Sequence, residues 1–261
     1  MTLSNDQIEQ FTDAGYLFLP GVFASAEVEV LRREVPEILA QQRPEVVREK
    51  DGTTPRTAFA AHTYNDLFGR LARHPRLIGP VEQLLGGPVY IHQFKINAKA
   101  AFDGDVWQWH QDYGTWQRDD DMPEARAMNV ALFLDDVTEF NGPLMLIPKS
   151  HKRGVLEAGH DVTTTSYPLW TLDHATIRAL VEDGGLVAPK GPAGSVLMFH
   201  GNLVHASPSN LSPWHRTIVY ISACHVDNHI RRFQRPAWIA HRDFAPIAAL
   251  PDDCLLEPAA A

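Results

Sequence analysis

The densest group of chemically capable side chains lies in the segment 107–113, which reads Trp-Gln-Trp-His-Gln-Asp-Tyr. The segment is typical of a β-strand, in which positions i and i+2 point to the same face roughly 6–7 Å apart. We therefore expect the imidazole of His110 and the carboxylate of Asp112 to converge on one metal ion. With a second imidazole they would form the facial triad of non-haem iron oxygenases, which leaves positions open for a co-substrate and O2.

A His-x-Asp tripeptide also arises by chance, and alone it is weak evidence that better fits a strand-edge histidine hydrogen-bonded to a neighbouring carboxylate. A second signal favours the metal. His205 follows the predicted strand 195–199, and Arg216 stands eleven residues later, at the start of the apolar strand 217–223. A hairpin of that length would return Arg216 beside His205, where its planar guanidinium could bind one carboxylate of a dicarboxylate co-substrate in bidentate fashion.

A row of polar side chains follows one face of the predicted strand 89–97. Gln93, Lys95 and Asn97 share that face in an otherwise apolar sheet. Such a row is costly unless it meets a polar ligand or solvent, so it either lines a site or forms a solvated surface. Among the tryptophans near the motif, core packing is the simpler interpretation, and we expect substrate contact only for Trp116.

The elements that must position these residues begin with helices. Ser4 and Gln7 form a capping box for a helix that ends at Gly15, a short strand covers 16–19, and Ser25 is expected to cap a second helix. A third helix is predicted over 65–85, and one or two short helices within 172–183. The remaining strands are predicted over 106–113, 127–134 and 144–148.

Helices followed by many short strands predict a mainly β fold with flanking helices, either a sandwich or a barrel. We expect one domain over 1–261, with a helical N-terminal part at about 1–87, a β core at about 88–225 and a C-terminal extension at 226–261. The run Asp119 to Asp121 is expected to be a solvated acidic loop.

Composition narrows the classes of partner. The 261 residues carry 23 Lys and Arg against 32 Asp and Glu, a net charge of −9, so neither nucleic acid nor an anionic membrane is an expected partner. Two cysteines provide neither a disulfide framework nor a Cys-rich zinc site and favour a reducing, cytoplasmic compartment. No signal peptide or membrane span is expected.

The order His110-x-Asp112, His205, Arg216 resembles the phytanoyl-CoA-dioxygenase-type branch of the Fe(II)/2-oxoglutarate-dependent oxygenases. Segments 92–99 and 104–113 are most similar to bacterial hydroxylases of free amino acids such as proline and leucine. Trp116, Asp120, Met122-Pro123 and 140–144 are also similar to ectoine hydroxylases. The resemblance covers about residues 4 to 245.

The resemblance implies a double-stranded β-helix, or jelly-roll, core. The ligands it implies for Fe(II) are His110, Asp112 and His205. The residues it implies for 2-oxoglutarate are Arg216, Ser207, Asn97 and Asn129. The residues it implies for the substrate are Gln93, Lys95 and Trp116. The reaction implied is hydroxylation of an unactivated C–H bond of a small amino-acid-like molecule, with release of succinate and CO2, by a monomer or homodimer.

Two alternatives use the same residues. One is a zinc-dependent hydrolase, although the sequence has no His-Glu-x-x-His motif to support it. The other is a non-catalytic jelly-roll binding protein with a vestigial metal site. The segment 154–173, where relatives carry a different lid, prevents the transfer of a substrate shape. Ectoine hydroxylases usually have Arg where this chain has Lys95.

Overall fold

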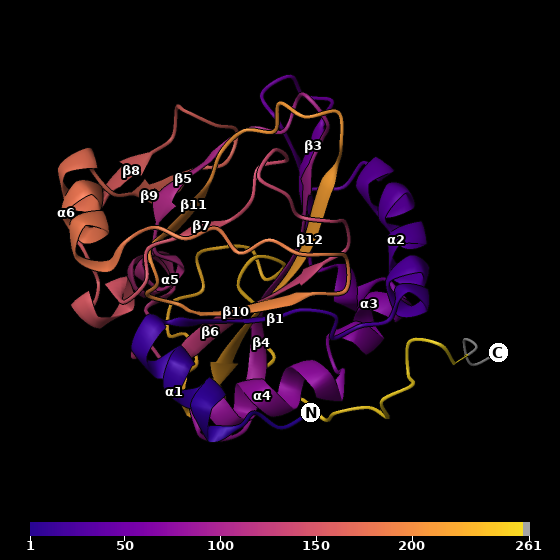
Figure 1. The fold of residues 1–261 in the computed structure, drawn as a ribbon. Coiled ribbons are helices and arrows are strands. Elements are labelled where there is room, and N and C mark those ends of the chain that lie inside the picture. The colour runs from indigo at the N-terminus through magenta and orange to yellow at the C-terminus, as the bar shows by residue number, and fades with distance from the viewer. Residues whose placement is uncertain (258–261) are drawn as a thin grey trace.

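The computed structural model describes residues 1–257; residues 258–261, the end of the predicted C-terminal extension, lie outside the described part. Two antiparallel sheets face each other there, with helices against their outer sides (Figure 1). One sheet has seven strands in the order β1-β10-β6-β12-β4-β3-β2, and the other has three in the order β5-β11-β7. This arrangement confirms the mainly β class with flanking helices. No helix within residues 1–257 is long and apolar enough to cross a membrane.

The α-helices are α1 (Asn5–Ala14), α2 (Ser25–Ala40), α3 (Asp66–Leu71), α4 (Pro75–Leu85), α5 (Asp112–Asp120) and α6 (His174–Gly184). The strands of the large sheet are β1 (Tyr16–Leu19), β2 (Val46–Arg48), β3 (Pro55–Phe59), β4 (Val89–Lys99), β6 (Ala127–Phe133), β10 (Val196–His200) and β12 (Arg216–His225). Those of the small sheet are β5 (Trp107–His110), β7 (Met145–Leu146) and β11 (His205–Ser207). A separate hairpin pairs β8 (Gly159–Asp161) with β9 (Leu169–Thr171).

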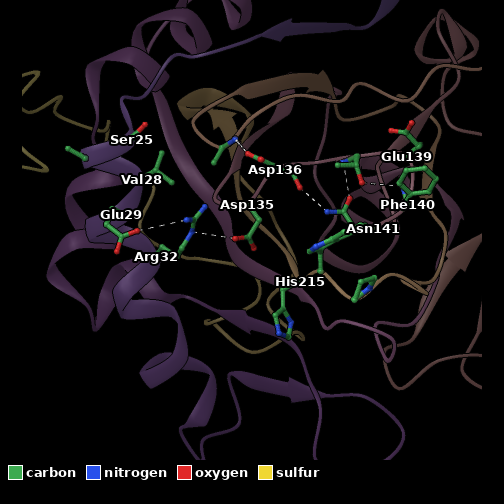
Figure 2. A pocket seen from close by; sticks show the side chains of 15 residues that line it. Ser25, Val28, Glu29, Arg32, Asp135, Asp136, Glu139, Phe140, Asn141 and His215 are labelled. Atoms are coloured by element: carbon green, nitrogen blue, oxygen red, sulfur yellow. Dashed lines mark hydrogen bonds and ion pairs between the residues drawn. The ribbon is translucent and has the colours of Figure 1, made fainter.

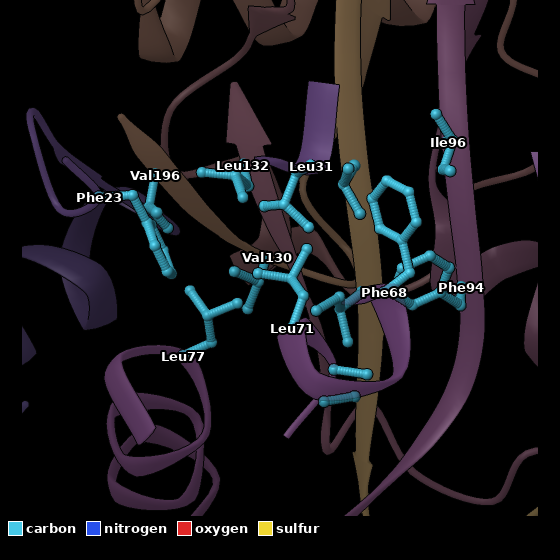
Figure 3. Close-up of a cluster of buried hydrophobic side chains, with 14 of the residues drawn as sticks. Phe23, Leu31, Phe68, Leu71, Leu77, Phe94, Ile96, Val130, Leu132 and Val196 are labelled. Carbon is cyan, nitrogen blue, oxygen red and sulfur yellow. The ribbon is translucent and has the colours of Figure 1, made fainter. Parts of the chain in front are cut away.

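The large sheet is buried on both faces. Side chains alternate along each of its strands, so one set packs on the outer face and the other on the inner face. On the outer face, residues such as Phe94, Ile96 and Val130 pack against α2, α3 and α4 (Figure 3). On the inner face, alternate residues such as Ala131 and Tyr220 meet the small sheet in a second core. Consecutive side chains of a strand point to opposite faces. Since Phe94 and Ile96 point outward, the odd-numbered residues beside them on β4 point into the space between the sheets.

The first two helical predictions are confirmed with one adjustment. Ser4 caps α1 in a capping box with Gln7, and Gly15 ends the helix at φ +83°. Ser25 is the first residue of α2 and not its cap. The cap is the preceding Ala24, whose backbone N–H donates to the Glu27 carboxylate at 2.8 Å, the half of a capping box that needs no polar side chain at the cap.

Two other predictions were wrong. The helix expected over 65–85 is broken into α3 and α4, because Pro75 disfavours helical geometry at His74, which instead caps α4. The N-terminal part expected to be helical also contributes β2 and β3, and β3 pairs with β4. The large sheet therefore extends well before residue 88.

Candidate active site

Three predicted metal ligands meet between the sheets. His110 ends β5, His205 begins β11, and the two residues are direct cross-strand partners. Asp112 does not share the strand of His110, as the sequence analysis expected, because β5 stops there and Asp112 opens α5. The turn at Gln111 still brings the carboxylate back, and one ligand atom from each residue lies within 4.8 Å of the others.

The hydrogen bonds of the two histidines leave only lone pairs facing the centre. His110 Nδ1 donates to the Gln108 carbonyl at 2.6 Å, and His205 Nδ1 donates to the Leu203 carbonyl at 2.9 Å. With Nδ1 as the donor, the neutral form of each ring presents its Nε2 lone pair, and the two Nε2 atoms lie 3.5 and 3.6 Å from the Asp112 oxygens. Three potential metal-ligating atoms therefore converge, so the site fits a cation, and fixing the tautomer through Nδ1 is typical of metal-bound histidines.

The electrostatics of the triad favour its ligand form. Burial, together with His110, lowers the pKa of His205 to about 3, so its imidazole is neutral. Burial alone would raise the pKa of Asp112, but the positive charge of Lys95 opposes it, and the pKa of Asp112 lies below its ordinary value. An anionic carboxylate and neutral imidazoles are the forms that bind a metal.

Asn129, predicted to contact the co-substrate, lies against the triad. Its Nδ2 donates to Asp112 Oδ2 at 2.8 Å, while Ser222 Oγ donates to its Oδ1 at 2.6 Å. These bonds fix the orientation of both the amide and the carboxylate. The contact with a co-substrate stays a prediction.

A cavity surrounds the triad between the two sheets. The predicted site residues that line it are Gln93, Lys95, Asn97, His110, Asp112, Trp116 and His205. The shared face predicted for Gln93, Lys95 and Asn97 is therefore correct, and it is an interior face rather than a solvated one. Ser207, Arg216 and Asn129 do not themselves form part of its wall.

Arg216 lies near Ser207 by a route that the sequence did not predict. No hairpin joins them, because β11 belongs to the small sheet and β12 to the large one, so residues 208–215 cross between the sheets. The Arg216 Nη2 atom donates to the Gly142 carbonyl at 2.9 Å and lies 3.5 Å from Ser207 Oγ. Its Nε is buried and has no partner among residues 1–257, which is costly unless a ligand accepts from it.

Glycine is required at position 142 for this contact. Its φ is +74°, and a Cβ would lie 2.8 Å from the Pro208 carbonyl oxygen and 2.7 Å from Lys99 Cδ. The buried Lys99 was missed by the sequence analysis. Its Nζ donates to the Asp105 carbonyl at 2.8 Å and also to the Pro208 carbonyl, which links the connections beside β5 and β11. Burial and the charge of Arg216 lower the pKa of Lys99 to about 6.

The other end of the cavity carries polar groups suited to a small polar ligand. Trp116 Nε1 donates to Gln93 Oε1 at 3.3 Å, so the predicted substrate residues contact each other. Thr115, which sequence reasoning missed, places a buried hydroxyl there that has no hydrogen-bond partner in the described part of the chain. It precedes Trp116 in α5, and only the helix that begins at Asp112 aims it into the cavity.

Arg235, from the C-terminal extension, also lines the cavity and was not predicted. Its Nε donates to Asp120 Oδ1 at 2.8 Å and its Nη2 to Oδ2, which leaves Nη1 outside this pair. Asp120 is therefore not part of a solvated acidic loop: it ends α5 and its relative exposure is 0%. The separation of 115 positions along the chain explains why no local pattern indicated the pair.

A larger hollow of about 1060 Å3 lies away from the triad, between the first turns of α2 and the connection after β6 (Figure 2). Its charged side chains are already satisfied. Arg32 lies 3.4 Å from Asp135, and Asp136 accepts from the Ala193 N–H at 2.8 Å. We assign the chemistry to the smaller cavity, because that is where ligand atoms and unpaired polar groups converge.

The fold and the triad together define a jelly-roll oxygenase of the non-haem iron class. The chain belongs to the family described as Phytanoyl-CoA dioxygenase (PhyH), which matches residues 11–218. The resemblance stated from the sequence is thereby confirmed, and with it the double-stranded β-helix core.

Among known proteins, the chain is 36% identical to L-proline trans-4-hydroxylase from Streptomyces griseoviridis, over 92% of this chain and 94% of the relative. It is 35% identical to ectoine dioxygenase from Bordetella parapertussis, over 84% and 74%. Among solved structures it is similar to EctD from S. alaskensis with 2-oxoglutarate and 5-hydroxyectoine. That match has 31% identity and a TM-score of 0.85, and it covers 95% of this chain and 87% of the other.

Proposed function

We propose that this enzyme is an Fe(II)- and 2-oxoglutarate-dependent hydroxylase of a small free amino or imino acid, with L-proline as the first candidate. Substrate C–H, 2-oxoglutarate and O2 would give the C–OH product, succinate and CO2. The observation that carries the proposal is the convergence of three metal-ligating lone pairs in a cavity that also contains cationic side chains for carboxylates.

The triad residues would hold the metal, and Asn129 would keep Asp112 in its ligating orientation. Bound Fe(II) supplies the activation of O2 coupled to oxidative decarboxylation of 2-oxoglutarate, which no side chain of the cavity provides. Arg216, with its unpartnered Nε and with Ser207 beside it, would bind the distal carboxylate of 2-oxoglutarate. Asn97, whose Oδ1 accepts from Thr57 at 2.6 Å, would present its amide N–H to the same molecule.

The opposite end of the cavity would hold the substrate. Among the described lining residues, Asp112 is the one carboxylate, whereas Lys95 and Arg235 are cations. A ligand carboxylate is therefore favoured there, since Arg235 Nη1 is not used by Asp120. The free hydroxyl of Thr115 can accept from an amine, which suits a molecule that carries both groups.

Two observations favour hydroxylation over the alternatives. Halogenases of this superfamily replace the metal-binding carboxylate with a small residue, whereas this chain retains Asp112. A zinc hydrolase needs a general base, and the described cavity wall offers no carboxylate besides that ligand. The similarity to a proline hydroxylase favours L-proline, and Lys95 in place of the usual Arg weighs against ectoine.

We also propose that the partners are small molecules alone and that the enzyme works in the cytoplasm as a monomer or homodimer. The net charge of −9 opposes binding to nucleic acid or to an anionic membrane. Two buried cysteines with free thiols suit a reducing compartment.

The test is reconstitution with Fe(II) under anaerobic conditions, followed by succinate measurement after addition of 2-oxoglutarate and O2. L-Proline, L-leucine and ectoine would be supplied in parallel. We expect one of them to stimulate succinate formation and to gain the mass of one oxygen atom. Absence of iron-dependent succinate under every condition would contradict the proposal. Catalytic activity of the protein loaded with Zn(II) in place of Fe(II) would favour the zinc-dependent hydrolase.

A further inference from the structure

A hairpin outside both sheets closes one side of the cavity. The covering hairpin, residues 159–171, consists of β8, β9 and their connection. It brings Tyr167 and Leu169 into the cavity wall, and Leu169 is buried. Because its side chains form part of the cavity wall, they are candidates for contact with the substrate.

Tyr167 occupies a defined place between two aromatic rings of the sheets. Its ring centroid lies 5.9 Å from that of Phe59 on β3 and 5.7 Å from that of Trp107 on β5. Both neighbours also line the cavity. Contacts with two other rings restrict the ring far more than an exposed loop would, so the hydroxyl has a fixed direction.

The hairpin itself is attached to the core on both strands. Gln108 Nε2 donates to Asp161 Oδ2 at 2.9 Å, and Trp170 Nε1 donates to Asp119 Oδ1 at 3.0 Å. Gln108 lies on β5 two residues before His110, and Asp119 lies on α5. The hairpin is therefore fastened to the two elements that carry His110 and Asp112, and its position is coupled to theirs.

The Tyr167 hydroxyl is a hydrogen-bond donor that experiences the positive charge of Arg235. Burial raises the pKa of Tyr167, and the charge of Asp112 acts in the same direction, so the group stays protonated despite the opposing charge of Arg235. Two donors, one of them cationic, thus line the same cavity. Such a pair suits an anionic oxygen that both can contact.

We infer that Tyr167 is a specificity-determining residue whose hydroxyl, with the guanidinium of Arg235, binds the carboxylate of the substrate while its ring limits the size of the molecule. The inference rests on the proposed function and names a residue of its substrate site. The cavity is far narrower than the hollow beside α2, so the size of each wall side chain decides what fits.

Tyr167→Phe tests the hydroxyl without removing the ring. L-Proline, L-leucine and ectoine, which all carry a carboxylate, are titrated by calorimetry into anaerobic protein loaded with Fe(II) and 2-oxoglutarate. For each compound that binds the wild type, we expect a Kd about 10- to 100-fold higher, the usual effect of losing a hydrogen bond to a charged group. Binding of 2-oxoglutarate should be unchanged.

Tyr167→Ala tests the ring, and Tyr16→Phe is the matched control because Tyr16 lies half-buried on β1 and away from the cavity. We expect Tyr167→Ala to form more succinate per hydroxylated product and to accept bulkier amino acids, and Tyr16→Phe to behave as the wild type. Thermal unfolding of each variant separates a binding change from a folding defect.

Equal Kd values for the wild type and Tyr167→Phe would overturn the inference, as would a failure of all three carboxylates to bind the wild type. Both results leave the proposed function standing if the wild type still forms succinate slowly in an iron-dependent reaction without substrate. If that succinate is absent, the proposed function fails, while the calorimetric comparison still decides the role of Tyr167.

Discussion

Replacing Arg216 with Met should separate the stability of the ligand-free protein from its response to 2-oxoglutarate. The Arg216 side chain is 1% exposed, and within residues 1–257 it forms no ion pair. Burial lowers the pKa of Arg216 against the opposing influence of Tyr220 and Asp135. A buried cation without a carboxylate partner is destabilising, so Arg216→Met should not lower the free energy of unfolding of the ligand-free protein.

The response to 2-oxoglutarate should fall sharply. Truncation of one partner of a buried, hydrogen-bonded charge pair costs about 2–5 kcal/mol, which raises the Kd by about 30-fold to several thousandfold. At a ligand concentration of about 100 times the wild-type Kd, binding adds about 2.7 kcal/mol to the free energy of unfolding. A Kd weakened by about 30-fold would reduce that gain to about 0.9 kcal/mol.

The assay is urea unfolding of anaerobic, Fe(II)-loaded protein with and without 2-oxoglutarate. Arg56→Met is the matched control, because Arg56 is equally buried but pairs with Glu49 at 2.8 Å. It should lose about 3–5 kcal/mol of stability and keep the gain from 2-oxoglutarate. An undiminished gain in Arg216→Met would refute the assignment of Arg216 to the co-substrate.

Three further predictions concern the triad and the acid stability of the fold. His110→Ala and His205→Ala should each abolish stoichiometric Fe(II) binding with an unchanged circular dichroism spectrum, and full iron content measured by metal analysis would remove that histidine from the ligand set. Asn129→Leu should reduce iron affinity about 10- to 100-fold through loss of its bond to Asp112, as measured by competition with a chelator; unchanged affinity would contradict the orienting role. Burial and the charge of His241 lower the pKa of His62 to about 3, so the unfolded chain takes up this proton first, near pH 6.5. Stability from neutral His62 is complete above about pH 6.5 and lost as pH falls toward 3, by about 2 kcal/mol at pH 5. His62→Phe should flatten the dependence of the free energy of unfolding on pH in this range, measured by urea unfolding. An unchanged slope would show that His62 is not its cause.

The parts of the site that follow strand periodicity could be predicted from the sequence. The alternation in β4 placed Gln93, Lys95 and Asn97 on one face, and the structure places all three on the cavity wall. Local signals also gave the capping box of α1 and most strands. The break between α3 and α4 could also have been predicted from the sequence, because Pro75 disfavours helical geometry at the preceding His74.

The parts that depend on contacts between distant segments could not be predicted. Asp112 joins the triad from a helix, because β5 ends once its pairing with β11 stops at His110. Arg235 enters the cavity through its pair with Asp120, and Tyr167 through contacts with rings on two other strands. None of these contacts leaves a period, cap or motif in the local sequence.

The central claim is that this chain inserts oxygen from O2 into a C–H bond at the site formed by the triad. The most direct test is mass spectrometry of the products formed under 18O2 with Fe(II), 2-oxoglutarate and the substrate that stimulates turnover. A dioxygenase of this kind should place one 18O atom in the hydroxylated product and one in succinate. Product oxygen that comes from solvent water would contradict the account and point to hydrolytic metal chemistry at the same residues.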